Sequence, residues 1–130
     1  MRAPQERRGA ILDAGAFIAL ERRDRVMVHL VQRFAEEELP LATSAGVVAQ
    51  VWRDGGRAQV PLTFLLRRTR VVDITHAVAR VLGRMLGATR TKDPIDAHVV
   101  LLARERGWPI LTSDPRALRA IDPHVGIQVI

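Results

Sequence analysis

The stretch DPIDAHVVLLARERGWPILTSDP, residues 93–115, predicts a helix, a short strand and the start of a second helix in direct succession. Asp93-Pro94 is typical of a helix start, and Gly107 of a helix end. The run PILT at residues 109–112 is mostly apolar, as in a strand that is buried on both faces, and Asp114-Pro115 repeats the helix-start pattern. This order of elements is the repeating unit of a parallel sheet covered by helices.

The same alternation extends over the rest of the chain. Apolar runs predict further strands at residues 9–13, 39–42, 70–74 and 126–130, of which the short run 39–42 fits an edge strand. Helical spacing, with caps at Thr43 or Ser44 and at Thr75 and terminators at Gly55-Gly56 and Gly87, predicts helices at residues 14–22, 25–38, 45–54, 58–68, 76–86 and 115–121. We therefore predict an α/β fold with three layers, α/β/α, and a mostly parallel central sheet of about five strands.

Length and composition limit the classes of protein that fit. With 130 residues, 48% of them hydrophobic, we expect a flexible N-terminal segment at residues 1–8 and a single domain at residues 9–130. The chain has no cysteine, which excludes disulfides, thiolate nucleophiles and cysteine-based zinc sites. It shows neither a secretory signal nor an apolar run that is long enough to cross a membrane, so we expect a cytoplasmic protein.

The charge points to an anionic partner. The net charge is +6, and Lys92 is the only lysine beside nineteen arginines. A basic surface of this kind favours RNA or DNA over a membrane. Tyrosine is absent and only 4% of the residues are aromatic, which argues against a surface that stacks bases on aromatic rings.

Four aspartates lie where a doubly wound parallel sheet places its ligands, at the carboxyl ends of the strands. Asp13 closes the strand GAILD, Asp114 closes the run PILTS, and Asp93 and Asp96 lie one turn apart at the start of a helix. Asp93 and Asp114 also fit as helix caps, and Asp96 fits a favourable interaction with the helix dipole. Asp13 is harder to explain in this way, because a charge beside a buried strand is costly unless it is paired.

Taken together, these carboxylates favour a metal. Clustered carboxylates repel one another, and Mg²⁺ or Mn²⁺ would relieve that repulsion through oxygen ligands. The four histidines have no metal-ligand spacing, and His98, two residues after Asp96, is interpreted as a packing residue. No glycine-rich phosphate loop is present, and no nucleophile elbow surrounds Ser44 or Ser113.

The chain resembles the PIN domain family, in particular the VapC-type toxins of bacterial toxin–antitoxin pairs. The matching segments are ILDAGAFIAL (residues 11–20), TSAGVVAQVWR (residues 43–53) and the stretch at residues 93–115. The resemblance implies a three-layer α/β/α fold and RNA cleavage that depends on Mg²⁺ or Mn²⁺. It also implies catalytic and metal-binding roles for Asp13, Asp96 and Asp114, with Asp93 as an auxiliary carboxylate. Thr112, Ser113, Ser44 and Gln50 would line this site.

One position departs from the family pattern. The second family acid is normally a glutamate, but this chain has Gln50, which keeps an oxygen acceptor and loses the charge. Gln50 could act as a neutral ligand or orient water, or its presence could leave a weak or inactive PIN-fold protein that binds RNA or a partner. Asp54, one turn beyond Gln50 in the predicted helix, could compensate.

The resemblance also implies partners. They are an RNA substrate, a small antitoxin that blocks the acidic cleft, and a second copy of the chain in a homodimer. We expect phosphate contacts from the arginines that lie close to the proposed rim in sequence, which are Arg53, Arg57, Arg67 and Arg90. A nuclease acting on DNA stays an alternative, because the same metal site could cleave either backbone.

Overall fold

Five short parallel strands form the centre of the molecule. The structure is a computed structural model that describes residues 8–130, so the predicted flexible segment 1–8 lies, apart from Arg8, outside the described residues. The strands are β1 (Ala10–Leu12), β2 (Leu41–Ser44), β3 (Thr69–Val72), β4 (Ile110–Thr112) and β5 (Ile127–Val129). They form one sheet in the order β3-β2-β1-β4-β5, and every neighbouring pair is parallel.

The strand order corrects one prediction. The strand predicted at residues 39–42 is β2, which pairs with both β1 and β3 and is therefore not an edge strand. All four residues of β2 (LATS) are buried, and so short a sequence does not indicate that the strand has a neighbour on each side. The edge on this side is β3, where Arg70 and Val71 are exposed. The chain reverses direction across the sheet between β1 and β4, so the carboxyl ends of these two strands flank the point where ligands bind in doubly wound sheets.

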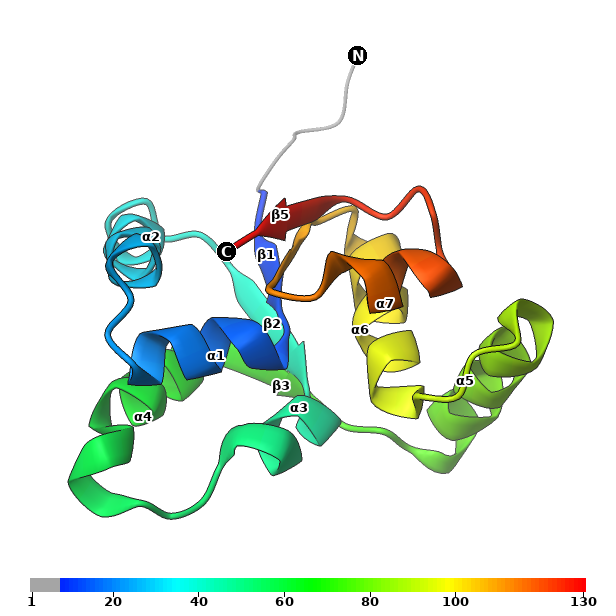
Figure 1. Cartoon of the computed structure of the whole chain (residues 1–130), viewed down its shortest axis with the longest axis horizontal. Coiled ribbons are helices and arrows are strands. Elements are labelled where there is room, and N and C mark those ends of the chain that lie inside the picture. Colours follow the sequence, from blue (N-terminus) through cyan, green and yellow to red (C-terminus); the bar gives the residue numbers. More distant parts are fainter. Residues whose placement is uncertain (1–7) are drawn as a thin grey trace.

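Helices cover both faces of the sheet, which confirms the predicted three layers (Figure 1). On one side α1 (Ala14–Glu21) packs against α2 (Arg25–Glu36), α3 (Ala45–Val51) and α4 (Val60–Arg67). On the other side α6 (Pro94–Arg106) packs on β1 and β2 and is flanked by α5 (His76–Thr89) and α7 (Pro115–Ile121). Because crossovers between parallel strands are right-handed, the reversal after β3 moves the later helices to the opposite face.

Several helix boundaries differ from those predicted, and α2, for example, ends at Glu36 rather than at residue 38. Helix α3 ends at Val51, so Asp54 lies outside it, in a left-handed conformation with φ 57°. A short 3₁₀ turn, η1 (Gly56–Gln59), precedes α4. Helix α5 continues through Gly87 to Thr89 and ends with Arg90 at φ 56°. The ends of α3 and α5 are therefore not set by the glycines alone. At the end of α5, for example, the amide of Thr91 donates a hydrogen bond to Leu86 O at 3.1 Å.

The core lies between the middle strands and the helices α1 and α6. Ile11 and Leu12 of β1 and Ile110 and Leu111 of β4 are buried, in keeping with a parallel sheet that is covered on both faces. Along residues 8–130, no helix combines the length and apolar character needed to cross a membrane.

Two glycines allow close approaches at the carboxyl edge of the sheet. A Cβ atom added at Gly15, in the first turn of α1, would lie 2.9 Å from the backbone nitrogen of Ser113. A Cβ atom at Gly46, in the first turn of α3, would lie 2.7 Å from Cγ1 of Ile95 in α6. The absence of these side chains therefore brings the segments around Asp13 and Asp114, and the starts of α3 and α6, into contact.

We predict that Gly15→Ala lowers the free energy of unfolding by about 1–3 kcal/mol, because the backbone at Ser113 would have to move. Urea unfolding followed by circular dichroism measures the change. Gly87→Ala is the matched control: it lies within α5 with no atom within 4 Å of an added Cβ, so it should stabilise the protein by about 0.5–1 kcal/mol. A Gly15→Ala protein as stable as the wild type would contradict the close approach.

Candidate metal centre

The four aspartates predicted to cluster lie at the carboxyl edge of the sheet, near enough for three of them to act electrostatically on Asp96. Asp13 directly follows β1, Asp114 lies two residues after β4, and Asp93 and Asp96 begin α6. Burial first, and then repulsion from the carboxylates of Asp93, Asp13 and Asp114, raise the pKa of Asp96 to about 6. The sheet reversal and the α6 start thus bring four acidic side chains to one edge, and Asp96 experiences the field of the other three.

Asp13 is the most buried of the four, with 8% of its surface exposed. Its Oδ2 accepts a hydrogen bond from Thr112 Oγ1 at 2.7 Å, and Thr112 Oγ1 accepts one from the backbone nitrogen of Asp114 at 2.9 Å. Although Asp13 occupies the N-cap position of α1, its side chain makes no capping bond. A buried carboxylate with one hydrogen-bond donor among the described residues is expensive, which favours a bound cation.

The capping roles considered for the other aspartates are present as well. Asp93 Oδ1 accepts from the amide of Ile95 at 2.8 Å and from that of Asp96 at 3.2 Å. Asp114 Oδ1 accepts from the amide of Ala117 at 3.5 Å, a long contact that restrains the side chain weakly. Asp93 therefore has an ordinary structural function in addition to its negative charge, whereas the side chain of Asp114 is held loosely.

The donor set fits a hard divalent cation in kind. Within residues 8–130, no three histidine, aspartate or glutamate side chains stand close enough together to hold a metal ion as they are oriented. The four aspartates nevertheless supply only oxygen donors, which Mg²⁺ and Mn²⁺ prefer, and their mutual repulsion at Asp96 is the condition that a cation would relieve. The cluster therefore has the donor chemistry of a site for such a cation, without ligands already gathered around one point.

The remaining residues predicted to line the site are spread around this edge. Thr112 bonds Asp13 directly, and Ser113 packs on Gly15. Ser44 is buried at the end of β2. Gln50 is exposed on α3, and its side chain makes no hydrogen bond to another described residue.

The four arginines proposed for phosphate contacts are all exposed. Arg53 and Arg57 follow α3, which begins at the carboxyl end of β2, and Arg90 lies three residues before Asp93 at the start of α6. Arg67 ends α4 immediately before β3 and so lies toward the amino ends of the strands, away from the acids. The structure therefore does not bring Arg67 to the cluster.

Sequence reasoning missed Gln59, which organises the connection between α3 and α4. Its side chain is buried, and its Oε1 accepts from the amides of Arg53 and Gly55 at 3.0 and 3.1 Å. Its Nε2 donates to Glu21 Oε2 and to Val51 O, both at 2.9 Å. A glutamine in a polar stretch carries no sequence signal for such a role, because its four partners come together only in the folded chain.

His98, predicted to pack rather than to bind metal, is 1% exposed. Its Nδ1 lies 2.7 Å from Ser44 Oγ. Burial lowers the pKa of His98, Glu105 opposes this shift and Arg106 adds to it, so the ring is neutral at physiological pH.

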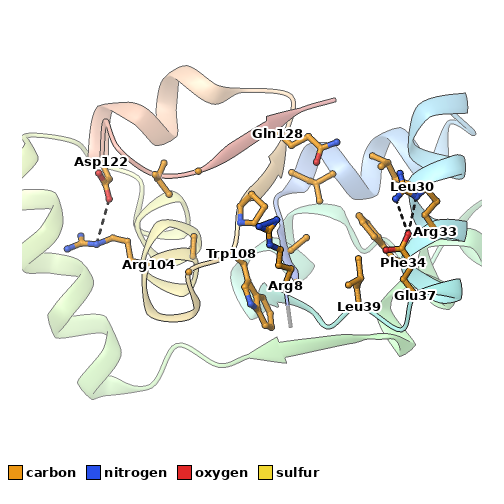
Figure 2. A pocket seen from close by; sticks show the side chains of 18 of the residues that line it. Arg8, Leu30, Arg33, Phe34, Glu37, Leu39, Arg104, Trp108, Asp122 and Gln128 are labelled. Carbon is orange, nitrogen blue, oxygen red and sulfur yellow. Dashed lines mark hydrogen bonds and ion pairs between the residues drawn. The ribbon is translucent and has the colours of Figure 1, made fainter. Parts of the chain in front are cut away.

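A cavity of about 820 Å³ lies at the opposite edge of the sheet, around the amino ends of β1, β4 and β5 (Figure 2). Arg8, Phe34 and Trp108 are among the residues that line it. Its two carboxylates are already paired, Glu37 with Arg33 at 2.9 Å and Asp122 with Arg104 at 3.7 Å. None of the four clustered aspartates lines this cavity, so it is separate from the candidate metal centre.

The fold and the acidic edge together define a doubly wound α/β/α protein with a carboxylate site at the sheet reversal. The sequence pattern of the PIN domain family matches residues 10–122, and the chain belongs to that family. A comparison with curated proteins gave no match.

Solved structures share this fold. VapBC2 from Rickettsia felis, bound to a DNA fragment from their promoter, aligns with a TM-score of 0.68 and 13% identity over 93% of this chain and 98% of that one. DNA-bound VapBC from Salmonella typhimurium aligns with a TM-score of 0.68 and 18% identity over 94% and 98%. PAE2754 from Pyrobaculum aerophilum aligns with a TM-score of 0.62 and 16% identity over 92% and 89%. At these identities the similarity establishes the fold.

The raised pKa of Asp96 has a consequence for the metal-free protein. Its folded-state pKa of about 6 exceeds the ordinary value of 3.8, so the folded state binds the extra proton and loses stability as the pH rises from about 4 to about 6. We predict that Asp96→Asn, which removes this charge, stabilises the metal-free protein by about 1 kcal/mol at pH 7.5, after allowance for solvent screening. Near pH 4 the gain should vanish.

Urea unfolding in EDTA at both pH values measures this effect. Asp73→Asn is the control, since Asp73 follows β3 at the same edge but is not among the carboxylates that act on Asp96. An Asp96→Asn protein that is less stable than the wild type at pH 7.5 would show that the charge is not repelled.

Proposed function

We propose that the protein is an endoribonuclease that uses Mg²⁺ or Mn²⁺ and is the toxin of a type II toxin–antitoxin pair. The observation that supports this most strongly is the repulsion of Asp96 by three further carboxylates at the sheet reversal, in a chain whose net charge is +6. An acidic centre in a basic protein is compatible with a phosphodiester substrate. The basic surface would attract the phosphate backbone of a nucleic acid, and the acidic centre would require a cation before a phosphate could approach it. We propose the cytoplasm as its location.

In this proposal Asp13, Asp96 and Asp114 hold the cation, with Asp93 as an auxiliary carboxylate. A bound Mg²⁺ or Mn²⁺ would supply a Lewis acid that neutralises phosphate charge and favours ionisation of water. Thr112 orients Asp13 by donating to one carboxylate oxygen and leaves the other with no described partner. Asp93 keeps one oxygen in the helix cap, so its second oxygen is available to the site.

Exposed arginines on two connections between helices support an elongated nucleic-acid substrate. Arg53 and Arg57 are exposed on the segment that Gln59 fastens to Glu21 and to the end of α3, and Arg90 lies just before α6. These guanidinium groups would contact phosphates and position the strand over the acids. RNA is the substrate that we propose, and DNA is the alternative that the assay below decides.

We predict that the purified protein cleaves structured RNA in Mg²⁺ or Mn²⁺ and stops when EDTA is added. Asp13→Asn and Asp96→Asn should each lower the cleavage rate at least about 100-fold, because each removes a ligand. Asp73→Asn should leave the rate unchanged. Gel assays on RNA and on DNA of the same sequence measure the rates, and cleavage that persists in EDTA would contradict the mechanism.

A metal titration, together with the cleavage assay, distinguishes an active enzyme from one weakened by Gln50. If Gln50 faces the site, Gln50→Glu should tighten Mn²⁺ binding by about 10-fold in a calorimetric titration, because a charged ligand replaces a neutral one. Gln32→Glu, an exposed change on α2, adds the same charge elsewhere and should have no effect. A wild type that is inactive and a Gln50→Glu protein that cleaves RNA would favour the binding-protein alternative. An unchanged titration would remove Gln50 from the site.

We also propose an antitoxin partner that docks on the helices α1, α2 and α4. Ile18, Val26 and Phe64 are large exposed apolar residues on these three helices, and Phe64 is 61% exposed. Helix α1 packs against both of the others, so the three side chains lie on adjoining elements (Figure 1). Exposed apolar side chains on adjoining elements are typical of a surface that a partner covers. The homodimer stays a prediction that sedimentation would measure.

Co-expression with the product of a short upstream reading frame tests the partner. We predict that the two proteins co-purify and that Phe64→Asp weakens their association at least about 10-fold, because it places a charge in an apolar contact. Val129→Asp, at a residue 57% exposed on β5, is the matched control and should have no effect. Equal losses for both variants would argue against this docking surface.

A further inference from the structure

The contact between His98 and Ser44 links two elements of the candidate site. His98 lies in α6, and Ser44 ends β2 and caps α3. The 2.7 Å bond between His98 Nδ1 and Ser44 Oγ is buried, with the two residues 1% and 0% exposed. The same Ser44 oxygen accepts from the amide of Gly46 at 3.0 Å, so it joins the two helix starts through one atom.

A second contact brings the same two helix starts together. Gly46 in α3 leaves no room for a side chain, because Cγ1 of Ile95 in α6 would lie 2.7 Å from an added Cβ. Helix α6 also packs on β1 and β2. The first turn of α6, which carries Asp96, is therefore held against the carboxyl end of β2 by packing and by one buried hydrogen bond.

The other end of this connection reaches Asp13. Thr43, the neighbour of Ser44 in β2, donates from Oγ1 to Leu12 O at 2.6 Å. Leu12 directly precedes Asp13. Two buried hydrogen bonds thus connect the backbone beside Asp13, through Thr43 and Ser44, to His98, which lies two residues after Asp96.

We propose that His98 is a positioning residue, which through Ser44 sets where the start of α6, and with it Asp96, stands relative to Asp13. A hydrogen bond constrains direction as well as distance, so it fixes the position of α6 along the sheet more narrowly than apolar packing does by itself. The consequence for metal binding rests on the proposed function; the position of α6 does not.

Substitutions that keep or remove the hydrogen bond test the proposal. His98→Leu removes it with little change in bulk, whereas the side-chain amide of His98→Asn can restore a partner near the Nδ1 position. Ser44→Ala removes the bond from the other side and serves if His98→Leu does not fold. Thr69→Val is the control, because it removes a buried hydrogen bond, to Leu65 O at 2.7 Å, at the amino end of β3.

Two measurements are made on each variant. In the metal-free protein, we expect His98→Leu to shift the amide resonance of Asp13, and Ser44→Ala to shift that of Asp96. In calorimetric titration with Mn²⁺, both variants should bind about 10-fold more weakly than the wild type, as for other groups that orient ligands without touching the metal. His98→Asn should stay within about twofold of the wild type. Thr69→Val should lower stability in urea without either change.

The outcomes separate this inference from the proposed function. If His98→Leu and Ser44→Ala lose stability like Thr69→Val but leave the resonances of Asp13 and Asp96 and the Mn²⁺ affinity unchanged, the pair only fills the core and the proposal is overturned. If the wild type binds no Mn²⁺ and cleaves no RNA, the proposed function fails, and the metal-free resonances still decide whether His98 positions α6.

Discussion

The arrangement of the acidic edge depends on two hydrogen bonds made by the hydroxyl of Thr112. It donates to the buried carboxylate of Asp13 and accepts from the amide of Asp114, so one oxygen joins the ends of β1 and β4. These strands are adjacent only because the sheet reverses between them. The close approach of Ser113 to Gly15 reinforces the same junction. Two acids separated by a hundred residues in the chain become neighbours here through backbone geometry and a single side chain.

The basic character of the chain and its acidic centre are complementary. The net charge is +6 and most of the arginines in the described part of the chain are exposed, whereas four aspartates gather at one edge, where burial and repulsion from the other three raise the pKa of Asp96. A phosphate backbone would be attracted by the first feature and repelled by the second unless a cation intervened. The metal-free fold therefore keeps a proton on Asp96 to a higher pH than an ordinary aspartate does, whereas a nearby cation would favour the ionised form.

The sequence was sufficient to predict the alternation of strands and helices, the parallel three-layer sheet and the identity of the clustered aspartates. It was insufficient for features that depend on neighbours. Strand β2 was predicted to be an edge strand but lies between β1 and β3, because a sequence of four residues does not show which strands pair with it. Gly87 was mistaken for a helix end, because a glycine ends a helix only where the backbone turns left-handed, and here Arg90 does so.

By itself, then, the sequence determined which residues could carry chemistry. Apolar runs specify buried strands, and the aspartates that follow the strands β1 and β4 fall at the carboxyl edge of any parallel sheet. Only the tertiary structure decided which groups meet. Three hydrogen bonds join residues that are distant in sequence: Thr112 to Asp13, Gln59 to Glu21, and the bond between His98 and Ser44. The sequence around a polar side chain does not indicate its hydrogen-bond partner. The free-energy cost of leaving that side chain unpaired arises only when folding removes water from it.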